Sequence, residues 1–188
     1  MRHRSEQGIL GPIVRIEGRR ILLREWQPDE LAAMQRWLGD PEVTRFLSWG
    51  ARTREDSARH LAECIAERDV VERRRYFLAV ELRDSARLIG DAGFQWTWLE
   101  GPQREGGFGY FLERAYWSRG YGTEAARLVL ALAFGEFDAT VMRASCDAHN
   151  VASEKVMQKC GMQRERDHEL PGRRAYRILS SEWQLPGG

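Results

Sequence analysis

Apolar residues spaced three and four positions apart predict four helices along the chain. Pro28 is suited to open the first helix, and Thr53 is suited to the N-cap of the second. Gly161 follows the last apolar position of the fourth helix, where a glycine favours its C-terminal end. The predicted helices cover residues 28–38, 53–66, 123–134 and 150–160, with a further short turn of helix between 41 and 46.

Shorter runs of β-branched and aromatic residues predict strands between these helices. The runs cover residues 13–16, 20–26, 76–82, 87–98, 108–112, 140–146, 162–166 and 175–183. We expect the run at 87–98 to kink at Gly90 or Gly93, and residues 100–107 to form a loop. The order of elements is strand, two helices, three antiparallel strands, helix, strand, helix and two strands. This order predicts an α+β, or mixed α/β, fold around one central sheet.

The composition is typical of one soluble globular domain. The chain has 188 residues, of which 43% are hydrophobic and 30% are charged, and this length is enough for one core. We expect residues 13–188 to form a single domain, preceded by a flexible arm at residues 1–12. The N-terminus lacks the apolar core of a signal peptide, and no apolar run reaches the roughly 18 residues that span a bilayer. These features favour a cytoplasmic protein with no membrane partner.

Charge and cysteine usage exclude two further classes of protein. The net charge is +1 and both signs are interspersed, so there is no basic stripe of the kind that binds nucleic acid. Cys64, Cys146 and Cys160 are widely spaced and form no CxxC pair, which predicts free thiols and no metal site. Cys146 and Cys160 fall on apolar core positions, which disfavours an acyl-cysteine mechanism.

One segment, residues 107–125, has the pattern of a phosphate-binding site. A strand leads into a glycine-containing loop, and the loop opens the helix that begins near Thr123. The first N–H groups of a helix have no intrahelical partner, and together with the helix dipole they favour an anion. Gly120 and Gly122 let a diphosphate approach the backbone, and Arg119 adds a positive charge. Taken alone, the same residues also suit a simple tight turn before a helix.

Four separated stretches of the chain form a more specific pattern. They are Ile21-Leu22-Leu23-Arg24 with Trp37-Leu38-Gly39-Asp40-Pro41-Glu42-Val43-Thr44; Gly109-Tyr110-Phe111-Leu112 with Tyr116-Trp117-Ser118-Arg119-Gly120-Tyr121-Gly122-Thr123-Glu124-Ala125; Asn150 to Met162; and Ser181-Glu182-Trp183. In this order they resemble the motifs of the GNAT superfamily of N-acetyltransferases. The similarity is greatest to the branch that contains the RimJ and RimL ribosomal-protein N-terminal acetyltransferases, and it extends over residues 13–183.

The resemblance implies a fold and a coenzyme site. The fold would be a curved, mostly antiparallel mixed sheet of seven strands with about four flanking helices. The sheet would splay between its fourth strand, ending near Leu112, and its fifth, ending near Cys146. The pantetheine arm of acetyl-coenzyme A would lie in that gap and pair with backbone groups of Phe111 and Leu112. The pyrophosphate would bind N–H groups of the loop, which consists of Arg119, Gly120, Tyr121, Gly122 and Thr123.

The resemblance also implies catalytic groups for direct acyl transfer. The reaction needs donors for the oxyanion, a proton for the departing thiolate and a neutral amine. A backbone N–H near Phe111 or Leu112 is the oxyanion donor in this family. Ser153, helped by Asn150, is our candidate proton donor, although Asn150 equally suits a helix N-cap with Ser153 at position N3.

The general base is the least defined of these groups. Relatives often carry a Glu on the strand just before the Gly-Tyr pair, where this chain has Gly107 or, in the alternative alignment, Gly106. Glu105 lies two residues earlier, so on a continued strand it would share the same face, and it is our candidate base. Glu113 is an alternative. Bulk water would also serve if the amine has a low pKa, as an N-terminal α-amine does.

These residues predict an acetyl-coenzyme A-dependent N-acetyltransferase that acts directly on a primary amine in a ternary complex. The acceptor would be a protein N-terminus or a small-molecule amine, and the resemblance leaves a homodimer open. One alternative is an acyltransferase that uses a larger donor such as succinyl-coenzyme A. Another is a non-catalytic acyl-coenzyme A sensor or interaction module, which the missing Glu at Gly107 favours.

Overall fold

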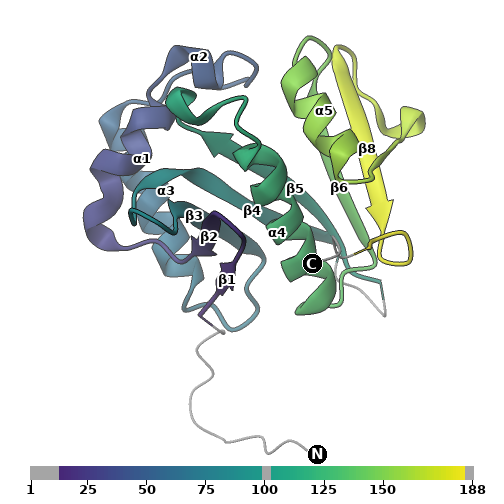
Figure 1. Ribbon diagram of the computed structural model, residues 1–188, viewed down its shortest axis with the longest axis horizontal. Coiled ribbons are helices and arrows are strands. Elements are labelled where there is room, and N and C mark those ends of the chain that lie inside the picture. Colours follow the sequence, from purple (N-terminus) through teal and green to yellow (C-terminus); the bar gives the residue numbers. More distant parts are fainter. Residues whose placement is uncertain (1–12, 99–102, 185–188) are drawn as a thin grey trace, which may run out of the picture.

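The computed structural model describes residues 13–98 and 103–184, which are built around one eight-stranded sheet (Figure 1). The strand order is β1-β2-β3-β4-β5-β6-β8-β7. All neighbouring strands are antiparallel except β5 and β6. The strands are β1 (Arg15–Glu17), β2 (Ile21–Arg24), β3 (Arg75–Leu82), β4 (Leu88–Trp98), β5 (Glu105–Leu112), β6 (Val141–Asp147), β7 (Gln163–Arg164) and β8 (Arg173–Leu179). The mixed α+β fold that the sequence predicts is therefore confirmed, with eight strands in place of seven.

One strand prediction is confirmed and another needs correction. The two N-terminal runs form separate strands, β1 and β2, as predicted, and they pair from Arg15 with Arg24 to Glu17 with Leu22. Residues 105–107, expected in a loop, are the start of β5, because Glu105 pairs with Trp98 on one side and with Val141 on the other. Pairing on both sides overrides the low strand propensity of the glycines here. The predictions for residues 1–12 and 100–102 lie outside the described residues.

Helices cover both faces of the sheet. They are α1 (Leu31–Leu38), α2 (Pro41–Thr44), α3 (Arg54–Glu67), α4 (Tyr121–Gly135) and α5 (Val151–Lys159). The predicted ends are confirmed at Thr53, whose side chain caps α3, and at Gly161, which has a φ of +80° after α5. One buried cluster, which includes Phe94 and Leu130, packs α4 against one face, and a second cluster around Trp37 packs α1 and α3 against the other.

Strand β4 is irregular at Gly90, one of the two positions where a kink was predicted. Its register with β3 shifts between Val80 and Glu81, which pair with Gly90 and Leu88. A Cβ on Gly90 would come 2.1 Å from the carbonyl oxygen of Phe111. Only glycine therefore allows the backbones of β4 and β5 to approach this closely.

The sheet opens between β5 and β6. These strands pair only at Glu105–Gly107 with Val141–Arg143, although β5 continues to Leu112 and β6 to Asp147. Figure 1 shows β6 and β8 diverging from β5 beyond this pairing. The splay predicted between the strands ending near Leu112 and Cys146 is confirmed.

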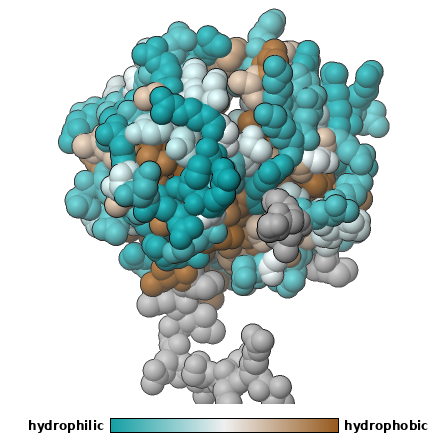
Figure 2. Space-filling model, viewed as in Figure 1, coloured by the Kyte–Doolittle hydropathy of each residue, from teal (hydrophilic) through white to brown (hydrophobic). Residues whose placement is uncertain are grey.

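The surface seen in the same direction is largely hydrophilic, with smaller hydrophobic areas between the polar side chains (Figure 2). Most large apolar side chains instead lie in the two clusters on either face of the sheet. Within residues 13–98 and 103–184, no helix combines the length and the apolar character needed to cross a membrane.

Candidate active site

A cavity of about 660 Å³ occupies the opening between β5 and β6. Its walls come from β5, the start of α4, the end of β6, the start of α5 and the segment that begins in α2 and continues to Leu47. Seven of the ten candidate site residues line it: Phe111, Leu112, Gly120, Gly122, Thr123, Asn150 and Ser153. Arg119 and Tyr121 flank this wall in sequence, and Glu105 lies outside the lining. These seven residues come from three separate segments of the chain, which meet at one cavity.

The start of α4 has the backbone geometry of an anion site. Gly120 is the N-cap residue with a φ of +83°, and no described side chain caps this end. The first backbone bond of the helix runs from the Glu124 N–H to the Gly120 carbonyl at 3.1 Å. The N–H groups of Tyr121, Gly122 and Thr123 precede that bond, so they have no partner within the helix. These donors and the helix dipole favour a phosphate at this point of the cavity.

The side chains of two of the predicted loop residues pack on Tyr116, and neither residue is in the lining of the cavity. The Arg119 side chain is exposed, with its guanidinium carbon 5.8 Å from the centre of the Tyr116 ring. Tyr121 packs edge-on against Tyr116 at 6.0 Å. A contribution of Tyr121 to phosphate binding would therefore come from its backbone N–H.

The backbone groups of Phe111 and Leu112 point in opposite directions, because they alternate along β5. The Glu113 N–H donates to the Ile89 carbonyl at 2.8 Å, so every second residue from Glu113 directs its backbone groups to β4. Phe111 belongs to that set and pairs with Asp91. The Leu112 N–H points into the opening, and its carbonyl accepts a hydrogen bond from Trp117 Nε1 at 2.8 Å. Of the two, Leu112 offers the backbone donor and Phe111 contributes to the cavity wall.

The start of α5 brings Ser153 and Asn150 to the same cavity. The Asn150 side chain accepts a hydrogen bond from the Ser153 N–H at 3.1 Å, which confirms Asn150 as the N-cap of α5. Beside them lies Tyr110, whose burial raises the pKa of its phenol to about 12, while the polar Ser153 side chain nearby acts in the opposite direction. Sequence reasoning gave Tyr110 no role, although its place after Gly109 in the motif was visible.

The two carboxylates considered as general bases are both held in ion pairs. Glu105 pairs with Arg143, which also bonds Glu165 at 2.9 Å. Glu113 pairs with Arg36 at 3.0 Å and with Arg87 at 3.2 Å. The structure brings neither carboxylate into the lining of the cavity.

The cysteines are free, buried thiols. Burial raises the pKa of all three, to about 12 for Cys64 and about 11 for Cys160. Cys146 lines the cavity but is only 4% exposed. A thiol with a raised pKa is a poor nucleophile at neutral pH, which agrees with the reasoning against an acyl-cysteine.

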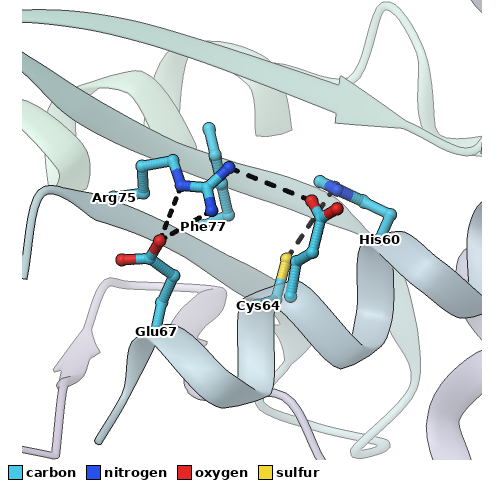
Figure 3. Close-up of a pocket in the computed structure, with 6 residues that line it drawn as sticks. His60, Cys64, Glu67, Arg75 and Phe77 are labelled. Carbon is cyan, nitrogen blue, oxygen red and sulfur yellow. Dashed lines mark hydrogen bonds and ion pairs between the residues drawn. The ribbon is translucent and has the colours of Figure 1, made fainter. Parts of the chain in front are cut away.

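A second, much smaller hollow is lined by residues of α3 and β3 (Figure 3). It measures about 10 Å³, and His60, Cys64 and Arg75 are among its lining residues. Burial, with Arg52 and Arg75 nearby, lowers the pKa of His60 to about 4, so this histidine is neutral at pH 7. Over the described part of the chain, no three His, Cys, Asp or Glu side chains gather as metal ligands.

Comparison with known proteins agrees with this geometry. A family model described as Acetyltransferase (GNAT) domain matches residues 20–163. The uncharacterized N-acetyltransferase YnaD of Bacillus subtilis is 28% identical over 176 residues, which cover 89% of this chain and 98% of that protein. The crystal structure of a GNAT-family acetyltransferase from Bacillus anthracis superposes with a TM-score of 0.76 at 24% identity, covering 90% of this chain and 100% of that one.

A further structure with the same fold contains the coenzyme. It is RimL, described as a ribosomal L7/L12 alpha-N-protein acetyltransferase in complex with coenzyme A. Its TM-score is 0.71 at 14% identity, covering 88% of this chain and 98% of that one. The family model spans most of this chain, and the split sheet with its uncapped helix N-terminus has the form expected of that family. The chain thus belongs to the GNAT acetyltransferases, whose members use acetyl-coenzyme A to acetylate amines.

Proposed function

We propose that this chain transfers an acetyl group from acetyl-coenzyme A directly to a primary amine, either a protein N-terminus or a small-molecule amine. One observation supports this most strongly. The uncapped N–H groups at the start of α4, the Leu112 N–H and the Ser153 side chain all meet one cavity of about 660 Å³. Acyl-coenzyme A carries a pyrophosphate and a thioester. Its transfer reaction requires a phosphate-binding site, a hydrogen-bond donor to the thioester carbonyl and a hydroxyl that can protonate the thiolate.

Each group has a separate task in this proposal. The N–H groups of Tyr121, Gly122 and Thr123 bind the pyrophosphate. The Leu112 N–H donates to the thioester carbonyl oxygen as negative charge develops on it. The Ser153 hydroxyl, fixed at the start of α5, supplies a proton to the departing thiolate. Asn150 holds Ser153 in place through the backbone bond at 3.1 Å.

Deprotonation of the amine is assigned to solvent in this proposal. Glu105, the candidate base from the sequence, is paired with Arg143 and lies outside the cavity lining. An α-amine has a pKa of about 8, so a useful fraction is neutral at pH 7 without a protein base. This favours acceptors with an amine of low pKa over the side chain of lysine, whose pKa is about 10.4.

A thiol-release assay with acetyl-coenzyme A and a panel of amines tests the function. The panel should contain α-amine peptides, free amino acids, polyamines and aminoglycosides, with succinyl-coenzyme A as a second donor. Acceptor-dependent release with acetyl-coenzyme A supports the proposal. Faster release with succinyl-coenzyme A would identify a different acyl donor. Coenzyme binding without turnover on any amine would indicate a sensor.

A further inference from the structure

Arg20 connects the turn between β1 and β2 to the first turn of α4. Its backbone N–H donates to Glu124 Oε1 at 2.7 Å, and its side-chain Nε donates to Glu124 Oε2 at 2.8 Å. The Ile21 N–H also donates to Glu124 Oε1, at 3.3 Å. A carboxylate in the first turn of α4 is thus held by a segment 104 positions earlier in the sequence.

The same guanidinium contacts the glycine loop itself. Arg20 Nη1 donates to the Arg119 carbonyl at 2.9 Å, and the guanidinium carbon lies 4.4 Å from the centre of the Tyr121 ring. Arg20 Nη2 is 3.3 Å from the place that a Cβ on Gly120 would occupy. One side chain therefore contacts three consecutive residues of the loop and the carboxylate that follows them.

The negative charge of Glu124 affects how strongly an anion binds at the start of α4. A carboxylate in the first turn of a helix interacts favourably with the helix dipole, but it repels a phosphate bound at the same end. The Glu124 side chain is only 16% exposed, so solvent screens it incompletely. Arg20, which is 35% exposed, supplies the opposite charge at 2.8 Å.

We propose that Arg20 is a positioning residue for the pyrophosphate loop, which it holds in shape while it neutralises Glu124. Arg20 needs no contact with the coenzyme for this role. The inference rests on the proposed function, because it assumes that the loop binds a pyrophosphate. It predicts that coenzyme affinity depends on the sum of the charges at positions 20 and 124, as well as on the shape of the loop.

Calorimetry with coenzyme A tests this through a charge cycle. Arg20→Gln removes the positive charge beside Glu124 and should weaken binding about tenfold, which corresponds to about 1.4 kcal/mol. Arg20→Lys keeps the charge and should recover most of that loss. Glu124→Gln removes the repulsive charge, so the single variant should bind at least as tightly as wild type. Added to Arg20→Gln, the Glu124→Gln substitution should restore part of the affinity for coenzyme A. If the Arg20–Glu124 pair only held the loop in shape, the double variant would instead bind more weakly than Arg20→Gln.

Steady-state kinetics and a matched control complete the test. In Arg20→Gln, KM for acetyl-coenzyme A should rise while kcat stays within about twofold, because Ser153 and Leu112 are untouched. The control Arg83→Gln removes a hydrogen bond that the Arg83 side chain, just after β3, donates at 2.7 Å to the carbonyl of Gly18, which lies in the same turn as Arg20. This variant should leave binding unchanged. Thermal melting of each variant verifies that it is folded, and Glu124→Gln and Arg20→Lys still decide the question if Arg20→Gln does not fold.

The outcomes separate this inference from the proposed function. If the wild-type protein does not bind coenzyme A, the proposed function itself fails. If wild type binds, but Arg20→Gln binds equally well or Glu124→Gln deepens its defect, then the role assigned to Arg20 is overturned and the proposed function stands.

Discussion

The ring of Tyr110 packs directly beneath Gly122. A Cβ on Gly122 would lie 2.9 Å from Tyr110 Cε2 and 3.4 Å from the phenol oxygen. The same phenol interacts with the Ser153 side chain. Tyr110 therefore connects the phosphate loop at the start of α4 with the hydroxyl at the start of α5. The two ends of the proposed coenzyme site share one aromatic side chain.

Gly122→Glu is expected to abolish coenzyme binding. The new Cβ would press on Tyr110, and the carboxylate would add negative charge where the pyrophosphate is proposed to bind. Calorimetry with coenzyme A measures the effect. Gly135→Glu is the matched control, since a Cβ at that end of α4 meets nothing within 4 Å. Equal affinities of the two variants would contradict the assignment of the loop.

Tyr110→Phe separates the packing of Tyr110 from its hydroxyl. The variant keeps the ring under Gly122, so coenzyme affinity should stay within about twofold of wild type. It removes the phenol hydroxyl beside Ser153, so kcat should fall about tenfold if the phenol orients the Ser153 hydroxyl. Rapid-mixing measurement of thiol release reports this rate. Unchanged binding together with an unchanged rate would show that Tyr110 acts by the packing of its ring alone.

Ser153→Ala tests the proton donor without disturbing the helix cap. Asn150 accepts its bond from the backbone N–H of residue 153, so the substitution leaves that bond in place. We expect kcat to fall by about 10² while KM for acetyl-coenzyme A changes little, because general acid catalysis contributes about 10² or more. Asn150→Ala is the contrasting variant and should lower the free energy of unfolding by about 1 kcal/mol. A kcat equal to that of wild type in Ser153→Ala would show that Ser153 is not the proton donor.

The sequence predicted the parts of the site that depend on local backbone chemistry. Gly120 and Gly122 before an apolar helix, and Asn150 at the start of another, have signals that come from their immediate neighbours. Arg20 and Glu124 illustrate what could not be seen, since two charged residues 104 positions apart show no pattern until the sheet brings them together. The pairing of Glu105 with Arg143 was hidden for the same reason. Residues 105–107 were misassigned because β6 stabilises a glycine-rich strand end that has little propensity of its own.

Glu105→Gln tests whether deprotonation of the acceptor needs a protein base. Because Glu105 is tied to Arg143 and lies outside the cavity lining, we expect kcat/KM to stay within about threefold of wild type at every pH. The rise of kcat/KM with pH should instead follow the pKa of the acceptor amine, and should move when amines of different pKa are compared. Glu113→Gln serves as the matched control. A loss of the pH-dependent rise in Glu105→Gln alone would identify Glu105 as the base.

Two groups outside the cavity, the buried Asp91 and the half-buried His60, should give the free energy of unfolding opposite dependences on pH. Burial raises the pKa of Asp91 to about 7, against an opposing hydrogen bond from Trp37, and the pKa of His60 is lowered to about 4. Between pH 4 and 7 the folded protein holds the proton on Asp91 and the unfolded chain does not. This contribution to the free energy of unfolding therefore falls as pH rises, by about 1.4 kcal/mol per pH unit. Between pH 4 and 6.5 the unfolded chain protonates His60 and the folded protein does not, so that contribution rises with pH by a similar amount.

Single substitutions at Asp91 and His60 should reveal how much each group contributes to the pH dependence of the free energy of unfolding. Relative to wild type, Asp91→Asn should gain stability as pH rises from 4 to 7, since it loses the unfavourable ionisation of a buried carboxyl. His60→Gln should lose its relative stability over pH 4 to 6.5, because the penalty that wild type bears at low pH is absent from the variant. Urea denaturation of the three proteins at half-unit pH intervals measures both differences. If the free energies of unfolding of wild type and Asp91→Asn changed with pH in the same way, Asp91 would ionise near its ordinary pKa. Solvent would then reach its carboxyl in the folded protein.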